Sequence, residues 1–154
     1  MAGYRFANTD EDYEVARVLF REYGNSLNNE LALQNFDEEL INIRSIYGLP
    51  EGGIVLAHED GLSLGCSGIK KLEPGVAELK RYYVRPAFRG RKIGLAMIQL
   101  SIQFASDLGY NKIKLNSLPE MKRAQEIYYA IGFYEIPAYF DNGIPGTIFM
   151  EKNL

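Results

Sequence analysis

A short loop rich in arginine and glycine carries the clearest chemical signal in this chain. It follows a segment that ends at Pro86, and it consists of Arg89, Gly90, Arg91, Lys92, Ile93 and Gly94. A loop between a strand and a helix directs several backbone N–H groups and the helix N-terminus at one point, and this geometry binds phosphate. Arg85 brings a further positive side chain to the arginines and lysine of the loop. The loop therefore predicts a site for a multiply charged phosphate ligand.

The elements that position this loop follow from the spacing of apolar residues and from turn signals. Val76–Val84 is predicted to be a strand, and Gly90–Leu108 a helix. Asp60-Gly61 separates two apolar runs and predicts a tight hairpin. Thr9 predicts the N-cap of a first helix, and Asp12 at its third position nearly completes a capping box.

The remaining elements give a mixed α/β pattern. They are expected, in chain order, as a strand at 4–7, a helix that ends at Gly24, a helix at 37–47, strands at 54–57, 62–69 and 112–115, a helix at 120–131, and strands at 133–139 and 147–151. We expect a single domain over residues 1–154. Its sheet should be mixed and mostly antiparallel, with about six to seven strands flanked by about four helices.

Composition excludes several classes of protein. The chain has one cysteine, Cys66, and one histidine, His58, which excludes an internal disulfide and a cysteine-based zinc site and disfavours any metal centre. Cys66 lies among small and apolar neighbours, which indicates a buried structural thiol. No apolar run approaches the roughly 20 residues that span a bilayer, and the N-terminus lacks a signal pattern. We expect a cytoplasmic protein without a metal and without a membrane partner.

Charge is distributed unevenly, although the net charge is only −3. Residues 1–60 carry 12 acidic and 4 basic side chains, whereas residues 61–154 carry 8 and 13. The asymmetry fits an ordinary solvated surface, or a site whose basic half holds an anion and whose acidic half attracts a cationic substrate. Nucleic-acid binding is not expected, because the basic residues gather at one loop and form no long stripe.

Three segments in a fixed order resemble the GNAT superfamily of N-acetyltransferases, which transfer an acetyl group from acetyl-CoA to an amine. The first is the strand at 78–84 with the loop that follows it. The second, from Ala124 to Phe133, is similar to the family signature A-x-x-x-Y-x-x-x-G-F. The third, from Asn116 to Met121, resembles the linker of a bacterial branch of small-molecule and uncharacterised enzymes. The resemblance covers residues 76–133 and implies a GNAT-like fold.

Two positions depart from the family pattern. The phosphate loop of the family usually reads Q/R-x-x-G-x-G/A, and this chain has Lys92 where the fourth residue is commonly glycine. We expect helical dihedral angles at Lys92, because lysine then fits and adds charge, whereas a positive φ would favour glycine. The second departure is Met121, where many members carry an asparagine that helps to hold the pantetheine arm.

The resemblance implies how acetyl-CoA is held. The backbone from Arg89 to Gly94 is expected to bind the pyrophosphate. Main-chain groups of Tyr82 and Val84 are expected to pair with the two amides of pantetheine, as a neighbouring strand would. The amide N–H of Tyr82 would also stabilise the oxyanion that develops on the thioester carbonyl.

Acetyl transfer to an amine requires a base, because the amine is an ammonium at neutral pH. Glu78 is the candidate, acting directly or through water. Strand alternation is expected to place Glu78, Tyr82 and Val84 on one face, so that Glu78 looks into the cleft that Tyr82 lines. The alternative is a surface glutamate paired with Lys80 or Arg81.

The departing thiolate gains from a proton or a hydrogen bond, and Tyr128 is the candidate acid at the CoA sulfur. The alternative is a core tyrosine, since the predicted helix around it has an apolar face. The resemblance favours the catalytic role, because Tyr128 is the tyrosine of the family signature. Tyr129 points about 100° away on a helix and is a weaker candidate.

Together these residues predict an acyltransferase: a single N-acetyltransferase domain that transfers acetyl directly from acetyl-CoA to a primary amine. The acceptor is expected to be a small-molecule amine or a peptide amine, and the protein a monomer or a homodimer. The competing hypothesis is a non-catalytic acyl-CoA-binding or regulatory module on the same fold. Such a module would need the Arg89–Gly94 loop but neither Glu78 nor Tyr128, so the presence of both favours the enzyme.

Overall fold

One seven-stranded sheet organises residues 1–154, all of which the computed structural model describes. Its strand order is β1-β2-β3-β4-β5-β7-β6. Only β4 and β5 pair in parallel, and every other neighbouring pair is antiparallel. The expected mixed, mostly antiparallel sheet is confirmed. The strands are β1 (Gly3–Phe6), β2 (Gly53–Glu59), β3 (Leu62–Glu73), β4 (Val76–Val84), β5 (Lys112–Ser117), β6 (Tyr134–Ile136) and β7 (Ile148–Asn153).

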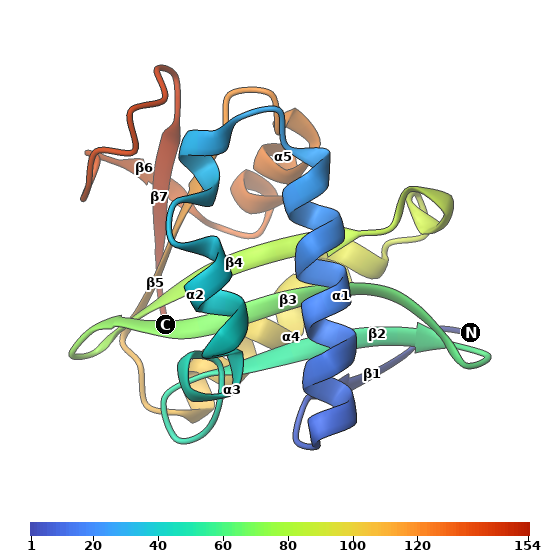
Figure 1. Cartoon of the computed structure of the whole chain (residues 1–154). Coiled ribbons are helices and arrows are strands. Elements are labelled where there is room, and N and C mark those ends of the chain that lie inside the picture. Colours follow the sequence, from blue (N-terminus) through green and yellow to red (C-terminus); the bar gives the residue numbers. More distant parts are fainter.

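The helices lie on both faces of the sheet. In Figure 1, α1, α2 and α3 lie in front of the sheet and α4 behind it, while α5 lies near the upper end of β5 and β7. The helix predicted at 37–47 is two short helices that break at Asn42, whose side-chain Nδ2 donates to Glu38 O at 3.0 Å. The helices are α1 (Asp10–Ser26), α2 (Phe36–Ile41), α3 (Ile43–Ile46), α4 (Ile93–Asp107) and α5 (Lys122–Ala130), with 3-10 turns η1 (Glu30–Leu33) and η2 (Pro86–Phe88).

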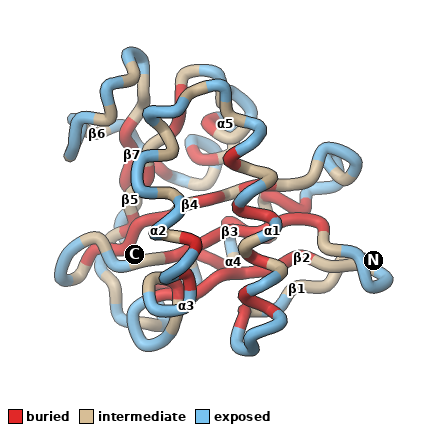
Figure 2. The backbone as a smooth tube through the Cα atoms, in the orientation of Figure 1, coloured by how far each residue is buried: buried red, intermediate tan, exposed pale blue.

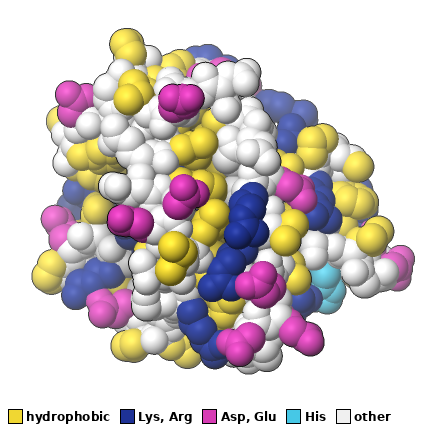
Figure 3. Space-filling model, viewed as in Figure 1, with side chains coloured by type: hydrophobic (Ala, Val, Ile, Leu, Met, Phe, Trp, Pro, Cys, Tyr) yellow, Lys and Arg dark blue, Asp and Glu magenta, His cyan; other side chains and the backbone are white.

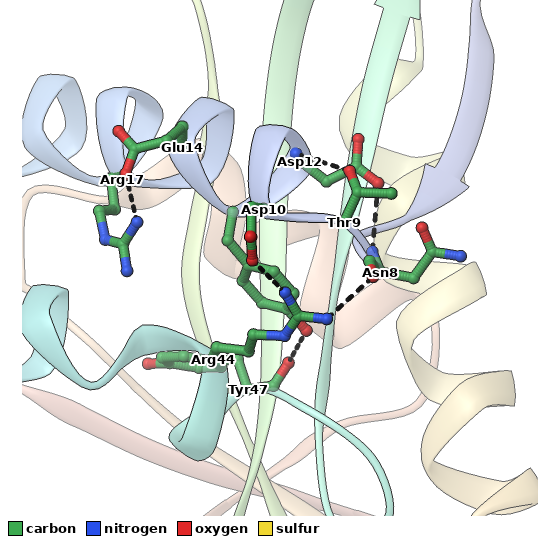
Figure 4. A network of polar contacts seen from close by, with 9 residues as sticks. Asn8, Thr9, Asp10, Asp12, Glu14, Arg17, Arg44 and Tyr47 are labelled. Carbon is green, nitrogen blue, oxygen red and sulfur yellow. Dashed lines mark hydrogen bonds and ion pairs between the residues drawn. The ribbon is translucent and has the colours of Figure 1, made fainter.

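Side chains identified in the sequence fix the start of α1. Asp12 N donates to Thr9 Oγ1 at 3.1 Å, as expected of the cap. The Asp12 carboxylate accepts from Asn8 N at 3.1 Å, one residue before the cap. Arg44 of α3 reaches the same turn, where it pairs with Asp10 and donates to Asn8 O at 3.1 Å (Figure 4). These bonds fasten α3 to the first turn of α1.

The hydrophobic core is divided between the two faces of the sheet. One cluster packs α1 and α3 on the sheet and includes Phe20 and Tyr47, and another packs α4 and α5 and includes Ile98 and Tyr128. Figure 2 shows the buried backbone running along the central strands between these layers. Cys66 is fully buried in the first cluster, as expected of a structural thiol, and burial raises the pKa of its thiol. No helix combines the length and the apolar character needed to cross a membrane.

A bulge in β4 changes the direction in which its side chains point. Cys66 of β3 lies opposite Tyr83, but Gly68 lies opposite Lys80, so β4 has one residue more than β3 between these pairs. Arg81 lies in the bulge with a φ of 59°, in the left-handed region. The regular alternation of side chains is therefore interrupted at this point.

Because of the bulge, the candidate residues are not arranged as the sequence predicted. Leu79 before the bulge and Tyr82 after it both pack in the cluster beneath α4 and α5. Glu78 alternates with Leu79 and so faces the side that α1 and α2 cover. Glu78 therefore does not share a face with Tyr82 and Val84. Unbroken alternation had predicted that it would.

Candidate active site

A cavity of about 960 Å³ opens where β4 and β5 separate. Only residues 76–78 of β4 pair with residues 112–114 of β5, and beyond Glu78 the two strands diverge. The cavity wall includes the later residues of β4, the end of β5, and the starts of α4 and α5. Several residues from the end of α1 to α2, within the range 26–39, and residues 140–142 of the β6–β7 connection complete it. The loop for which the sequence predicted an anionic ligand, Arg89–Gly94, borders this cavity.

The loop after β4 presents unpaired backbone N–H groups beside this cavity. The N–H groups of residues 90–95 make no hydrogen bond within the chain, and the first bond of α4 runs from Ala96 N to Lys92 O at 3.2 Å. Gly90, Ile93 and Gly94 line the cavity. Unpaired N–H groups at a helix N-terminus form an anion site. The free N–H groups that the sequence predicted at this strand-to-helix loop are therefore present, and phosphate binding by them stays a prediction.

Lys92 does not have the expected backbone conformation. It is the N-cap of α4 with φ 62° and ψ 16°, in the left-handed region. The expectation of helical dihedral angles was wrong, because this residue turns the chain into the first turn of the helix, and α4 begins only at Ile93. A left-handed lysine is strained relative to glycine, which explains why glycine is common at this position of the family.

Two of the expected cations turn away from the ligand site. Arg85 donates to both carboxylate oxygens of Glu22 in α1, at 2.9 and 2.6 Å. Arg91 donates to Glu59 at the end of β2, at 2.7 Å. Neither side chain lines the cavity. The sequence placed these arginines on the correct loop but could not show which acids would bind them.

The other two cations stay at the cavity. Arg89 lines it while its Nε donates to Val84 O at 2.8 Å. Lys92 also lines it and has no hydrogen-bond partner in the chain. At the loop itself, the positive charge available to a bound anion therefore comes from Arg89 and Lys92, together with the backbone N–H groups.

The main chain of Tyr82 and Val84 points into the gap. Arg85 N donates to Leu64 O of β3 at 2.8 Å, so alternation turns the N–H groups of Val84 and Tyr82 away from β3. On that side β5 has already diverged. These N–H groups are thus available to an extended ligand that lies along β4.

Tyr82 and Tyr128 meet inside the cavity, with ring centroids 6.2 Å apart in an edge-to-face arrangement. A Cβ at Gly94 would collide with the Tyr82 hydroxyl, so the close approach of Tyr82 requires this glycine. Tyr128 is only 6% exposed and its hydroxyl makes no hydrogen bond within the chain. Burial raises the pKa of Tyr128 well above its usual value, which keeps the hydroxyl protonated.

Glu78 is buried just outside the cavity wall, with 3% of its surface exposed. The Tyr139 hydroxyl donates to Glu78 Oε2 at 2.7 Å, and Oε1 makes no hydrogen bond within the chain. The same hydroxyl lies beside the side chain of Asn116, which lines the cavity. Glu78 is therefore separated from the cavity by one layer of side chains and does not look directly into it.

A charged pair that the sequence did not identify lies on the opposite wall. Arg81 donates to both oxygens of Glu39, at 2.8 and 2.7 Å, and the Tyr47 hydroxyl donates to the same carboxylate at 3.0 Å. The Arg81 guanidinium lies 5.0 Å from the Phe36 ring centroid. Burial acts to raise the pKa of Glu39, but the hydrogen bonds and charge of Arg81 outweigh burial and lower it. No local pattern marks this pair, because the bulge that turns Arg81 toward α2 has no glycine or proline signal.

Most of the predicted ligand-binding residues are thus gathered at one cavity. Those that line it are Tyr82, Val84, Arg89, Gly90, Lys92, Ile93, Gly94 and Tyr128, whereas Glu78 and Arg91 do not.

Comparison with known proteins agrees with this geometry. Residues 13–133 match the acetyltransferase (GNAT) family. The chain is 34% identical over 146 residues to an uncharacterized N-acetyltransferase of Schizosaccharomyces pombe, covering 94% of this chain and 90% of that protein. An acetyltransferase from Streptococcus agalactiae has a similar structure, with a TM-score of 0.80 at 19% identity over 99% of this chain and 98% of the other. The PaiA N-acetyltransferase of Thermoplasma acidophilum, in complex with coenzyme A, has a TM-score of 0.72 at 19% identity over 99% of each chain. The chain belongs to the GNAT family of acetyltransferases.

Proposed function

We propose that this protein transfers an acetyl group directly from acetyl-CoA to a primary amine of a small molecule or a peptide, and that residues 1–154 form a single domain for this reaction. The observation that carries the proposal is one cavity that joins the unpaired N–H groups of residues 90–95 to the protonated hydroxyl of Tyr128. The coenzyme A bound to the Thermoplasma relative supports the choice of cofactor.

The cavity residues fit a coenzyme A thioester. The backbone from Arg89 to Gly94 would hold the pyrophosphate, with the Arg89 and Lys92 side chains adding positive charge. The N–H groups of Tyr82 and Val84 would pair with the pantetheine amides, since β4 leaves them free. Acetyl-CoA supplies an activated acyl group and a thiol leaving group.

Glu78 and Tyr128 take the proton-transfer roles in this proposal. The free Oε1 of Glu78 would receive the ammonium proton of the acceptor through a water molecule, while Tyr139 holds Oε2 in place. The Tyr128 hydroxyl would donate its proton to the sulfur, and the N–H of Tyr82 would face the developing oxyanion. Transfer is direct, because the buried Cys66 thiol is engaged with Arg81 O at 3.3 Å and offers no acyl-accepting nucleophile.

The test is release of free thiol from acetyl-CoA in the presence of a panel of amines, with the acetylated product identified by mass spectrometry. We expect thiol release that depends on both the amine and the protein. Calorimetric titration with coenzyme A provides the second measurement. Tight binding of coenzyme A without transfer to any amine of a broad panel would overturn the proposal and leave the non-catalytic acyl-CoA-binding module.

A further inference from the structure

Lys80 places an unpaired positive charge on the cavity wall that also holds Arg81 and Glu39, which we call the acceptor side. It lies opposite Gly68, at which a Cβ would meet Tyr47, so it faces the side of the sheet that α1 to α3 cover. Lys80 lines the cavity, and its ammonium makes no hydrogen bond or ion pair within the chain. The protein has no buried side-chain nitrogen without a hydrogen-bond partner, so the unpaired Lys80 ammonium must be accessible to solvent. The cavity is the space beside it.

The acidic side chains near Lys80 already have partners. Glu39 binds Arg81 through both of its oxygens, and Glu78 accepts from Tyr139. Burial lowers the pKa of the Lys80 ammonium, and the neighbouring charges of Arg81 and Lys70 lower it further. Glu78 and Glu39 offset this effect only in part, because neither makes an ion pair with Lys80. A ligand anion would supply the missing partner.

The acidic N-terminal half does not provide an acidic acceptor site. Glu39 is the only acidic residue within positions 1–60 that lines the cavity, and it is paired. Figure 3 shows acidic and basic side chains interspersed on the face that carries α1 and α2, without a broad negative patch. Glu120 and Asp141 line the cavity from the loop before α5 and from the β6–β7 connection, but on the wall formed by Lys80, Arg81 and Glu39 the unpartnered charge is a cation.

We propose that the acceptor is a zwitterion of the α-amino-acid class, whose carboxylate pairs with Lys80 and whose amine faces Glu78. Residues two apart on one strand face are spaced about 7 Å along the strand, so an amine and a carboxylate on one carbon can lie between them, with the carboxylate at Lys80 and the amine joined to Glu78 through the water molecule. The inference rests on the proposed function, because it names the class of substrate that binds on the acceptor side of the same cavity. It replaces the cationic substrate that charge asymmetry along the sequence suggested.

The experiment compares amino acids with the amines that lack only the carboxylate, such as phenylalanine with phenylethylamine and lysine with cadaverine. Each pair is measured as a substrate with acetyl-CoA, and as a ligand of the protein saturated with coenzyme A by calorimetry. Lys80→Met removes the charge and keeps most of the side-chain volume, and Lys80→Arg restores the charge. Lys71→Met is the matched control, since Lys71 lies on β3 outside the cavity.

We expect the carboxylate-bearing member to be preferred, and Lys80→Met to reduce this preference by about 10- to 100-fold, mainly through KM. Lys80→Arg should recover part of it, and Lys71→Met should retain it. The inference is overturned if the wild-type protein shows no preference in either measurement, or if Lys80→Met preserves it. Carboxylate binding that depends on Lys80 without any transfer would uphold the inference while refuting the proposed function.

Discussion

The Glu39→Gln substitution should destabilise the protein strongly, although Glu39 lies on the cavity wall and not in the middle of the core. The side chains of Arg81 and Glu39 are only 7% and 13% exposed, and they share two hydrogen bonds. Removing one charge leaves the Arg81 guanidinium buried without its counterion, which costs about 3–5 kcal/mol. At about 2–4 °C per kcal/mol for a chain of this size, the melting temperature should fall by roughly 6–20 °C.

Acidification supplies an independent check on the same pair. Arg81 holds the pKa of Glu39 below its ordinary value of 4.5 in the folded protein, so the stabilisation is fully present above that value. It is lost as the pH falls through the lowered pKa, and the difference between wild type and Glu39→Gln should shrink there. Urea denaturation near neutral pH and under acid conditions measures both effects.

The matched control is Glu14→Gln, because Glu14 is 65% exposed and pairs with Arg17 on the surface of α1. It should change stability by less than about 0.5 kcal/mol. Two results would contradict this account of the buried ion pair. One is that near neutral pH Glu39→Gln lowers the free energy of unfolding no more than Glu14→Gln does. The other is that the difference in free energy of unfolding between wild type and Glu39→Gln grows on acidification.

Three further outcomes are expected. Tyr128→Phe should lower kcat by about 100-fold or more in steady-state assays. Tyr128→Phe should leave the urea midpoint nearly unchanged, because the lost hydroxyl has no hydrogen-bond partner in the protein. Tyr129→Phe is the control and should retain activity. If Tyr128→Phe and the wild type have equal kcat values, Tyr128 is not the acid. Glu78→Gln should abolish turnover or shift its pH profile upward, since only amines that are already neutral would react, and an unchanged profile would exclude Glu78 as the base. Lys92→Gly should raise the free energy of unfolding by about 0.5–1 kcal/mol by relieving the positive φ, and a loss of stability in urea would contradict that account.

Local signals in the sequence were sufficient for most of the fold. Asp60 and Gly61 adopt φ values of 50° and 78° and form the predicted tight hairpin, because the turn depends on those two residues alone. Thr9 caps α1 for the same reason. That Tyr82 and Tyr128 lie in one cavity was expected from the resemblance to the GNAT superfamily and not from the spacing of apolar residues.

The features that sequence analysis missed depend on contacts between distant segments. The β4 bulge places Arg81 against Glu39, which is 42 residues earlier in the chain, and no local pattern encodes that contact. Period-two alternation assumes an unbroken strand, and so it placed Glu78 on the wrong face. The left-handed conformation of Lys92 was missed because lysine rarely adopts it, whereas glycine at this position would have signalled it.

The bulge in β4 also means that a substitution and a deletion in this strand have different consequences. Lys80 and Arg81 sit on the acceptor side, while the hydrogen-bonding edge of residues 82–84 lies beyond the bulge. In the proposed function, a substitution at position 80 alters acceptor choice and leaves in place the edge proposed to hold coenzyme A. Deletion of residue 81 would instead restore alternation with Tyr82 still on the face of Leu79, and it would remove the partner of Glu39 on the cavity wall. Within this strand, point substitutions can change the acceptor side, whereas a change in its length removes the bulge and the Arg81–Glu39 pair that depends on it.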